Sequence, residues 1–238
     1  MSELDAIRAF YHWNSAVRRK YLETILRLPP EERLKDRGAS YPSLQEIYAH
    51  LLDGHRFWFE LVPQDRVEDA LKLELPAREL TPERLRRATD DIDALVNGYL
   101  AGLSEQDLPR EIVTHFPGPN GPSERRFPVA DVLWHMVEEE LQHIGELNAL
   151  LWQMDIEPPL GSYDEWKAAR AASTGPARRR SGTRGPLPLF DVNGVVTDVV
   201  RRFGRVRCRV RRAARIALDH VAVRRGHADP IAAEYNKP

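Results

Sequence analysis

The chain has 238 residues, of which 42% are hydrophobic and 30% charged, a composition typical of a globular protein. It contains no apolar run approaching the roughly 18 residues of a membrane-crossing helix, and its acidic, then amphipathic N-terminus lacks the pattern of a secretory signal. We therefore expect no membrane contact. Cys208 is the single cysteine, which excludes a disulfide within the chain and leads us to expect a cytoplasmic protein.

The net charge of −1 conceals two segments of opposite character. Residues 171–238 hold 15 Lys and Arg against 5 Asp and Glu, whereas residues 1–170 hold 20 against 31. Residues 171–186 are rich in Gly, Pro, Arg and Ser, which predicts a linker. For the Arg-rich residues 187–238 we predict a tail that is disordered or an aberrant extension. The positive charge of this tail would suit nucleic acid, but aromatic residues do not alternate with its arginines and it contains no recognisable nucleic-acid-binding motif. Both observations argue against nucleic-acid binding.

Within residues 1–170, apolar side chains recur at the three- and four-residue steps of amphipathic helices. The first predicted helix runs from about Glu3 to Leu28 and ends at a Pro-Pro pair. The second runs over residues 43–62, where Ser43 and Glu46 form a capping-box signature.

The third predicted helix runs from about Pro82 to Leu103, with Thr81 as its N-cap and proline at its first position. A short hairpin is expected around the turn signal Asn120-Gly121. The fourth helix covers Asp131 to Met154. Four long helices joined by long connections predict an all-α four-helix bundle, a fold whose core commonly holds metal sites.

His135, Glu139 and His143 lie along one stripe of the fourth helix, because a step of four residues rotates a helix by only about 40°. The stripe adjoins the apolar side predicted for this helix, formed by Leu133, Val137, Leu141, Leu147, Leu150 and Leu151. Polar groups turned inward need partners, and imidazole nitrogens and carboxylates are ligands for a divalent metal. The alternative stays open, since this spacing is common by chance and the run Glu138–Glu140 is typical of a solvated face.

Three segments of the chain resemble, in the same order, the DinB/YfiT-like superfamily of metal-binding four-helix bundles. They are HWNSAVRRKYLETILRLPPEE, SLQEIYAHLL and VLWHMVEEELQHIGELNALLWQMDIEPP, and the resemblance covers residues 1 to about 160. It implies one divalent metal, zinc or nickel, held by His50, Glu139 and His143. Glu139 stands where the usual last-helix pattern has histidine, and this His-Glu-His set is similar to the mycothiol-dependent maleylpyruvate isomerase branch. His135 and His55 are then supporting or substitute residues.

Three protein ligands would leave an open position for water or substrate, as in catalytic zinc sites. The resemblance implies a small-molecule substrate and an S-transferase or isomerase that activates a low-molecular-weight thiol. Two alternatives are a hydrolase using metal-bound water, whose pKa drops to near ~7, and a non-catalytic, stress-related binding bundle. The resemblance also favours a homodimer, because related bundles often pair through helices and the aromatic run Phe57–Phe59 and Trp152 would need covering. The sequence does not decide between a monomer and a homodimer.

Overall fold

The computed structural model describes residues 2–159 and 162–174, which lie within one compact unit, Met1–Pro176. Its four long helices are α1 (Glu3–Leu26), α3 (Leu44–Arg56), α5 (Pro82–Ala101) and α6 (Val129–Gln153). The shorter elements are α2 (Pro30–Arg33), η1 (Phe57–Leu61), η2 (Val67–Asp69), α4 (Ala70–Leu73), η3 (Ala77–Glu79), η4 (Glu105–Asp107), β1 (Glu111–Phe116), β2 (Ser123–Pro128) and α7 (Tyr163–Thr174).

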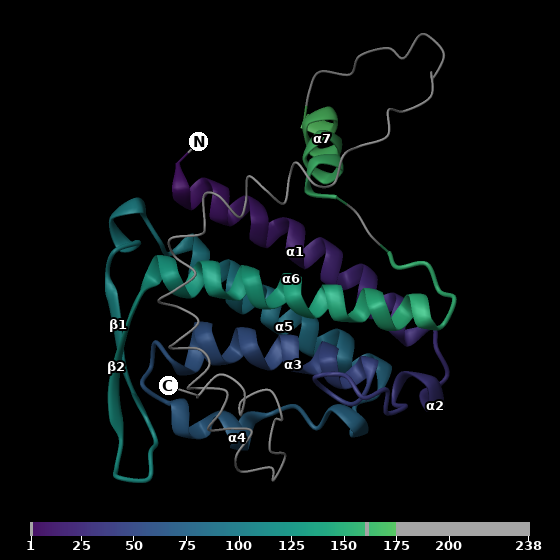
Figure 1. The fold of residues 1–238 in the computed structure, drawn as a ribbon. Helices are drawn as coiled ribbons and strands as arrows, with labels where there is room; N and C mark the ends of the chain where they lie inside the picture. Colours follow the sequence, from purple (N-terminus) through teal and green to yellow (C-terminus); the bar gives the residue numbers. More distant parts are fainter. Residues whose placement is uncertain (1, 160–161, 175–238) are drawn as a thin grey trace, which may run out of the picture. The chain divides into compact units, whose positions relative to one another are not determined.

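The four long helices form the predicted bundle, in which α3 packs against both α6 and α5, and α1 packs against the same two (Figure 1). Ser43 and Thr81 cap α3 and α5 as expected, each accepting a hydrogen bond from the backbone N–H three residues on. The predicted hairpin is also confirmed: β1 pairs antiparallel with β2, with Glu111 opposite Pro128 and Phe116 opposite Ser123. β2 runs directly into α6, so the hairpin stands where that helix begins.

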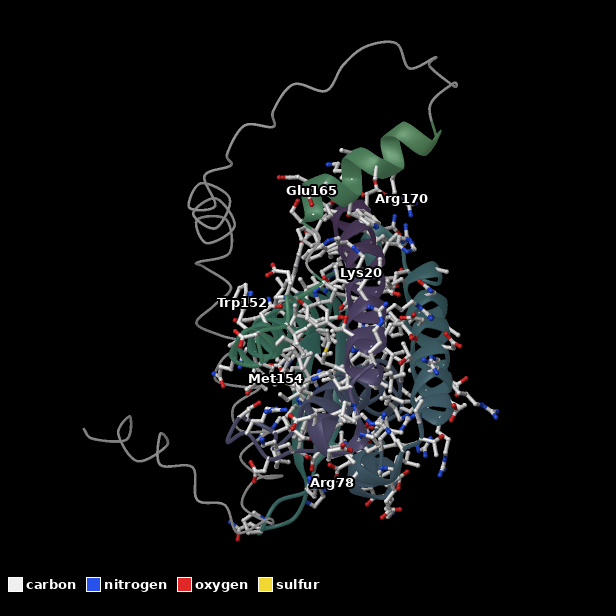
Figure 2. All side chains as sticks on the ribbon, turned by 90° about the vertical axis from the view of Figure 1, so that its right-hand side faces the viewer. Lys20, Arg78, Trp152, Met154, Glu165 and Arg170 are labelled. Atoms are coloured by element: carbon white, nitrogen blue, oxygen red, sulfur yellow. The ribbon has the colours of Figure 1, made fainter. Side chains whose placement is uncertain are left out.

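The second predicted helix continues past Arg56 as a π-helical turn, η1, in which the N–H of Val62 bonds to the carbonyl of Phe57. This wider turn carries Trp58 and Phe59 into the core, where they are 7% and 3% exposed. The expectation that the aromatic run Phe57–Phe59 needs a partner chain to cover it is therefore wrong for these two residues. Trp152 is 54% exposed and lies on the surface, as Figure 2 shows.

The predicted inward side of α6 is confirmed except at Leu141, which is 42% exposed. α7, which the periodicity did not predict, stacks Tyr163 on Phe10 of α1 at a centroid distance of 4.5 Å. Because α7 extends to Thr174, the first residues of the predicted linker are helical. The rest of the linker and the Arg-rich tail lie outside the described residues. Among the described residues, no helix is long and apolar enough to span a membrane.

Candidate metal centre

His50 of α3 and Glu139 and His143 of α6 meet where these two helices pack together. Each offers one ligand atom, and the three atoms lie within 4.8 Å of one another. His143 is buried, and the other two are half-buried. The structure thus brings together the three residues that the sequence predicts as metal ligands.

The donor set suits a divalent metal. Two imidazole nitrogens with one carboxylate oxygen is a combination found at catalytic zinc sites. Nε2 of His143 lies 3.7 Å from Oε2 of Glu139, and the rings of His50 and His143 are 4.8 Å apart between centroids. Metal–ligand bonds of about 2.0–2.1 Å keep any two ligand atoms within roughly 4 Å. In the tetrahedral geometry usual for zinc that separation is about 3.4 Å, so the widest spacing, up to 4.8 Å, must close by roughly an ångström for the three side chains to share one ion.

Glu146, three residues after His143, supports this group from the far side of the imidazole. Its carboxylate lies 3.1 Å from Nδ1 of His143 and also accepts hydrogen bonds from the backbone N–H and hydroxyl of Ser40. Burial raises the pKa of Glu146, but His143 and Ser40 outweigh it and leave the pKa lowered. An ionised carboxylate only accepts, so Nδ1 of His143 donates the proton and Nε2 is directed toward Glu139.

The protonation of His143 gives a prediction for metal binding. Burial lowers the pKa of His143, but its interactions with Glu139 and Glu146 raise it to about 9. The imidazole is therefore protonated in the metal-free protein at pH 7, and a metal must displace that proton from Nε2. We expect Zn²⁺ binding at pH 7 to release about one proton, and the apparent affinity to rise about tenfold per pH unit between pH 7 and 9.

Calorimetric titration at pH 7 in two buffers of different ionisation enthalpy measures this proton release. An observed enthalpy that is the same in both buffers would contradict it. A chelator competition at pH 7, 8 and 9 checks the slope of the affinity independently.

His135 lies one turn before Glu139, and its Nε2 is 4.0 Å from Oε1 of that residue. It is 6% exposed and stands edge-on to Trp58 of the π-helical turn, 5.1 Å between centroids. Burial lowers the pKa of His135, which the negative charge of Glu139 opposes without reversing. A neutral imidazole beside the carboxylate of a candidate ligand is consistent with the supporting role predicted for His135.

His55 is not part of the group formed by the three candidate ligands, and the contacts of its ring nitrogens lie elsewhere. Its Nδ1 bonds to the carbonyl of Leu51, and its Nε2 lies 3.3 Å from both Arg18 and Glu140. A five-residue step from His50 turns His55 by about 140° around the helix, toward the centre of the bundle.

Arg18, His55, Asp93 and Glu140 form a buried charged cluster to which each long helix contributes one residue. Arg18 lies 2.6 Å from Asp93 and 2.7 Å from Glu140. Burial raises the pKa of Glu140, but the guanidinium of Arg18 and the imidazole of His55 leave it lowered. Because Glu140 adjoins Glu139 in the chain, this cluster also fixes the rotation of α6 that turns Glu139 toward His50.

The chain was also compared with known proteins. A search of curated proteins found no match. The family model of the DinB superfamily matches residues 14–147, which include all three candidate ligands. With the helical bundle and the His-Glu-His group in agreement, the chain belongs to the DinB superfamily.

Proposed function

We propose that the protein is a metal-dependent enzyme that activates a low-molecular-weight thiol for transfer or isomerisation, with Zn²⁺ as the first candidate metal and Ni²⁺ as the second. The observation that carries the proposal is the convergence of three side chains, His50, Glu139 and His143, in a group that could hold a metal ion; residues 2–159 and 162–174 add no fourth member to this group. A closed structural zinc site has four protein ligands, whereas a catalytic site has three and an open position.

A bound divalent ion would supply Lewis acidity, which lowers the pKa of a thiol or water in the open position. The chain's own residues would hold the ion, with a single negative charge from Glu139 among the three ligands. A His₂Glu set therefore leaves a net positive centre, which favours a thiolate as an additional ligand. His135, neutral and buried beside Glu139, would keep that carboxylate in position.

The proposal predicts activity that needs both metal and thiol. The purified protein loaded with Zn²⁺ would be assayed with glutathione, cysteine and a cysteinyl pseudodisaccharide thiol against a panel of electrophilic acceptors. Thiol consumption reports transfer, and conversion of the acceptor to an isomer without thiol consumption reports isomerisation. We expect turnover in the loaded wild type and a loss of more than about 100-fold in Glu139→Ala, in line with a contact to the reacting centre.

The same assay separates the alternatives. Turnover of aryl esters without any thiol, lost in Glu139→Ala, would replace transfer by hydrolysis. A protein that binds metal and turns over neither class would be a non-catalytic binding bundle. Equal conversion of the acceptor with and without metal, in the presence of thiol, would contradict the proposal outright.

A further inference from the structure

A short loop, Arg37–Pro42, connects α2 with α3 and reaches the candidate metal centre. The N–H of Arg37 bonds to the carbonyl of Pro42 at 2.7 Å, which closes the loop on itself. Gly38 has a φ of +66°, a left-handed conformation that glycine adopts without strain. The loop is therefore a defined turn that presents Ser40 and Tyr41.

Ser40 binds the loop to α6 through a single carboxylate. Its backbone N–H donates to Oε1 of Glu146 and its hydroxyl to Oε2, each at 2.6 Å. The same Oε2 lies 3.1 Å from Nδ1 of His143. One carboxylate thus accepts from both a candidate ligand and a loop about 100 residues away in the sequence.

Tyr41, next in the loop, packs on the candidate ligands. Its ring stacks on His50 with centroids 4.1 Å apart and planes 21° apart. It also meets His143 edge-on at 6.0 Å. The position of the loop therefore fixes an aromatic ring against two of the three candidate ligands.

From these contacts we propose that Glu146 is the positioning residue of the metal centre, which orients His143 through Nδ1 and, through Ser40, holds Tyr41 over His50. The inference rests on the proposed metal centre and adds that one carboxylate links the orientation of His143 to the position of the loop Arg37–Pro42. Carboxylates that bond to the far nitrogen of a ligand histidine fix its tautomer and ring orientation. Here the same carboxylate also secures the loop, so loss of Glu146 disturbs His143 directly and His50 through Tyr41.

The test compares Glu146→Ala and Glu146→Gln with the wild type, using Glu138→Gln as the control. Glu138 is an exposed glutamate on the same helix and is not among the side chains that converge on the candidate metal centre. Zn²⁺ affinity is measured by competition with a chromophoric chelator, and the geometry of the centre by the visible spectrum of the Co²⁺-loaded protein. Hydrogen exchange of a peptide covering residues 37–42 reports the amide of Ser40, and circular dichroism confirms that each variant folds.

We expect Glu146→Ala to lower Zn²⁺ affinity by about 10–100-fold, as for other carboxylates that support a ligand histidine. Its Co²⁺ spectrum should shift and the amide of Ser40 should exchange faster. Glu146→Gln keeps one acceptor oxygen and should recover part of the affinity, while Glu138→Gln should match the wild type.

The two claims fail separately. If the wild type binds Zn²⁺ but Glu146→Ala keeps the same affinity, Co²⁺ spectrum and Ser40 exchange, the positioning role is wrong and the metal centre stands. A folded wild type that takes up neither Zn²⁺ nor Co²⁺ would overturn the metal centre, and the positioning role with it.

Discussion

Replacement of Glu139 by alanine is expected to lower the affinity for Zn²⁺ by more than about 100-fold, beyond the 10–100-fold typical of residues that only support a ligand. Glu139 supplies the only carboxylate of the three candidate ligands, and the pKa of this carboxyl is lowered, so it is ionised at neutral pH. Its burial opposes ionisation, and the nearby His143, His135 and His50 outweigh that burial. Removing the charge would leave two neutral imidazoles, a weak site for a dication.

Glu138→Ala is the matched control, because Glu138 precedes Glu139 on α6 but is exposed. Its Zn²⁺ affinity should equal that of the wild type in the same chelator competition. His50→Ala and His143→Ala should show losses comparable to that of Glu139→Ala. Unchanged affinity in Glu139→Ala would mean that the metal, if bound, is held by other residues.

The second large effect concerns stability: Arg18→Ala is expected to reduce the free energy of unfolding by about 3–5 kcal/mol. Arg18 is 2% exposed, and its guanidinium lies 2.6 Å from Asp93 and 2.7 Å from Glu140. Truncating it leaves the buried carboxylate of Glu140 without a guanidinium and leaves Asp93 paired only with the partly exposed Arg19. The uncompensated charge at Glu140 accounts for most of the expected loss. Urea denaturation of the metal-free protein, followed by circular dichroism, measures the change.

Arg86→Ala is the control for losing an arginine ion pair. Arg86 pairs with Glu23 at 2.8 Å, but both side chains are nearly half exposed, so solvent screens the pair and its loss should cost far less stability than the loss of Arg18. If Arg18→Ala fails to fold, the triple variant Arg18→Met, Asp93→Leu, Glu140→Met is measured in its place and should be about as stable as the wild type. Replacing a whole buried ionic group by apolar residues is often neutral or stabilising. Equal costs for Arg18→Ala and Arg86→Ala would show that the cluster is not the buried ionic centre described above.

The long helices could be predicted because a helix with one buried face repeats apolar residues every three or four positions. Ser43 and Thr81 fixed two helix starts through their capping chemistry, and both are confirmed. The π-helical turn after Arg56 was not predictable, since it depends on the hydrogen bond between Val62 and Phe57 rather than on a residue pattern.

The glutamate run of α6 shows where sequence interpretation reached its limit. Consecutive helical residues point about 100° apart, so Glu138 faces solvent, Glu139 faces His50, and Glu140 faces Arg18. A solvated run was the wrong interpretation for Glu140, which is 1% exposed. The available signal was Arg18, a charged residue seven positions after Tyr11 within the apolar stripe of α1.

Glu146 was also missed, although its spacing offered a hint. It lies three residues after His143, within reach of the same turn of helix. Its importance depends on Ser40, which approaches from a loop far away in the sequence, and no local pattern encodes that approach. His50, by contrast, was identified through the family resemblance, because nothing in α3 alone distinguishes it from His55.

The central claim is that His50, Glu139 and His143 hold one divalent metal ion, and anomalous diffraction from crystals grown with Zn²⁺ tests it most directly. Data collected on either side of the zinc absorption edge should give one strong anomalous peak within bonding distance, about 2.0–2.2 Å, of both imidazoles and the Glu139 carboxylate. No anomalous peak among these three side chains, or zinc bound only elsewhere on the protein, would contradict the account.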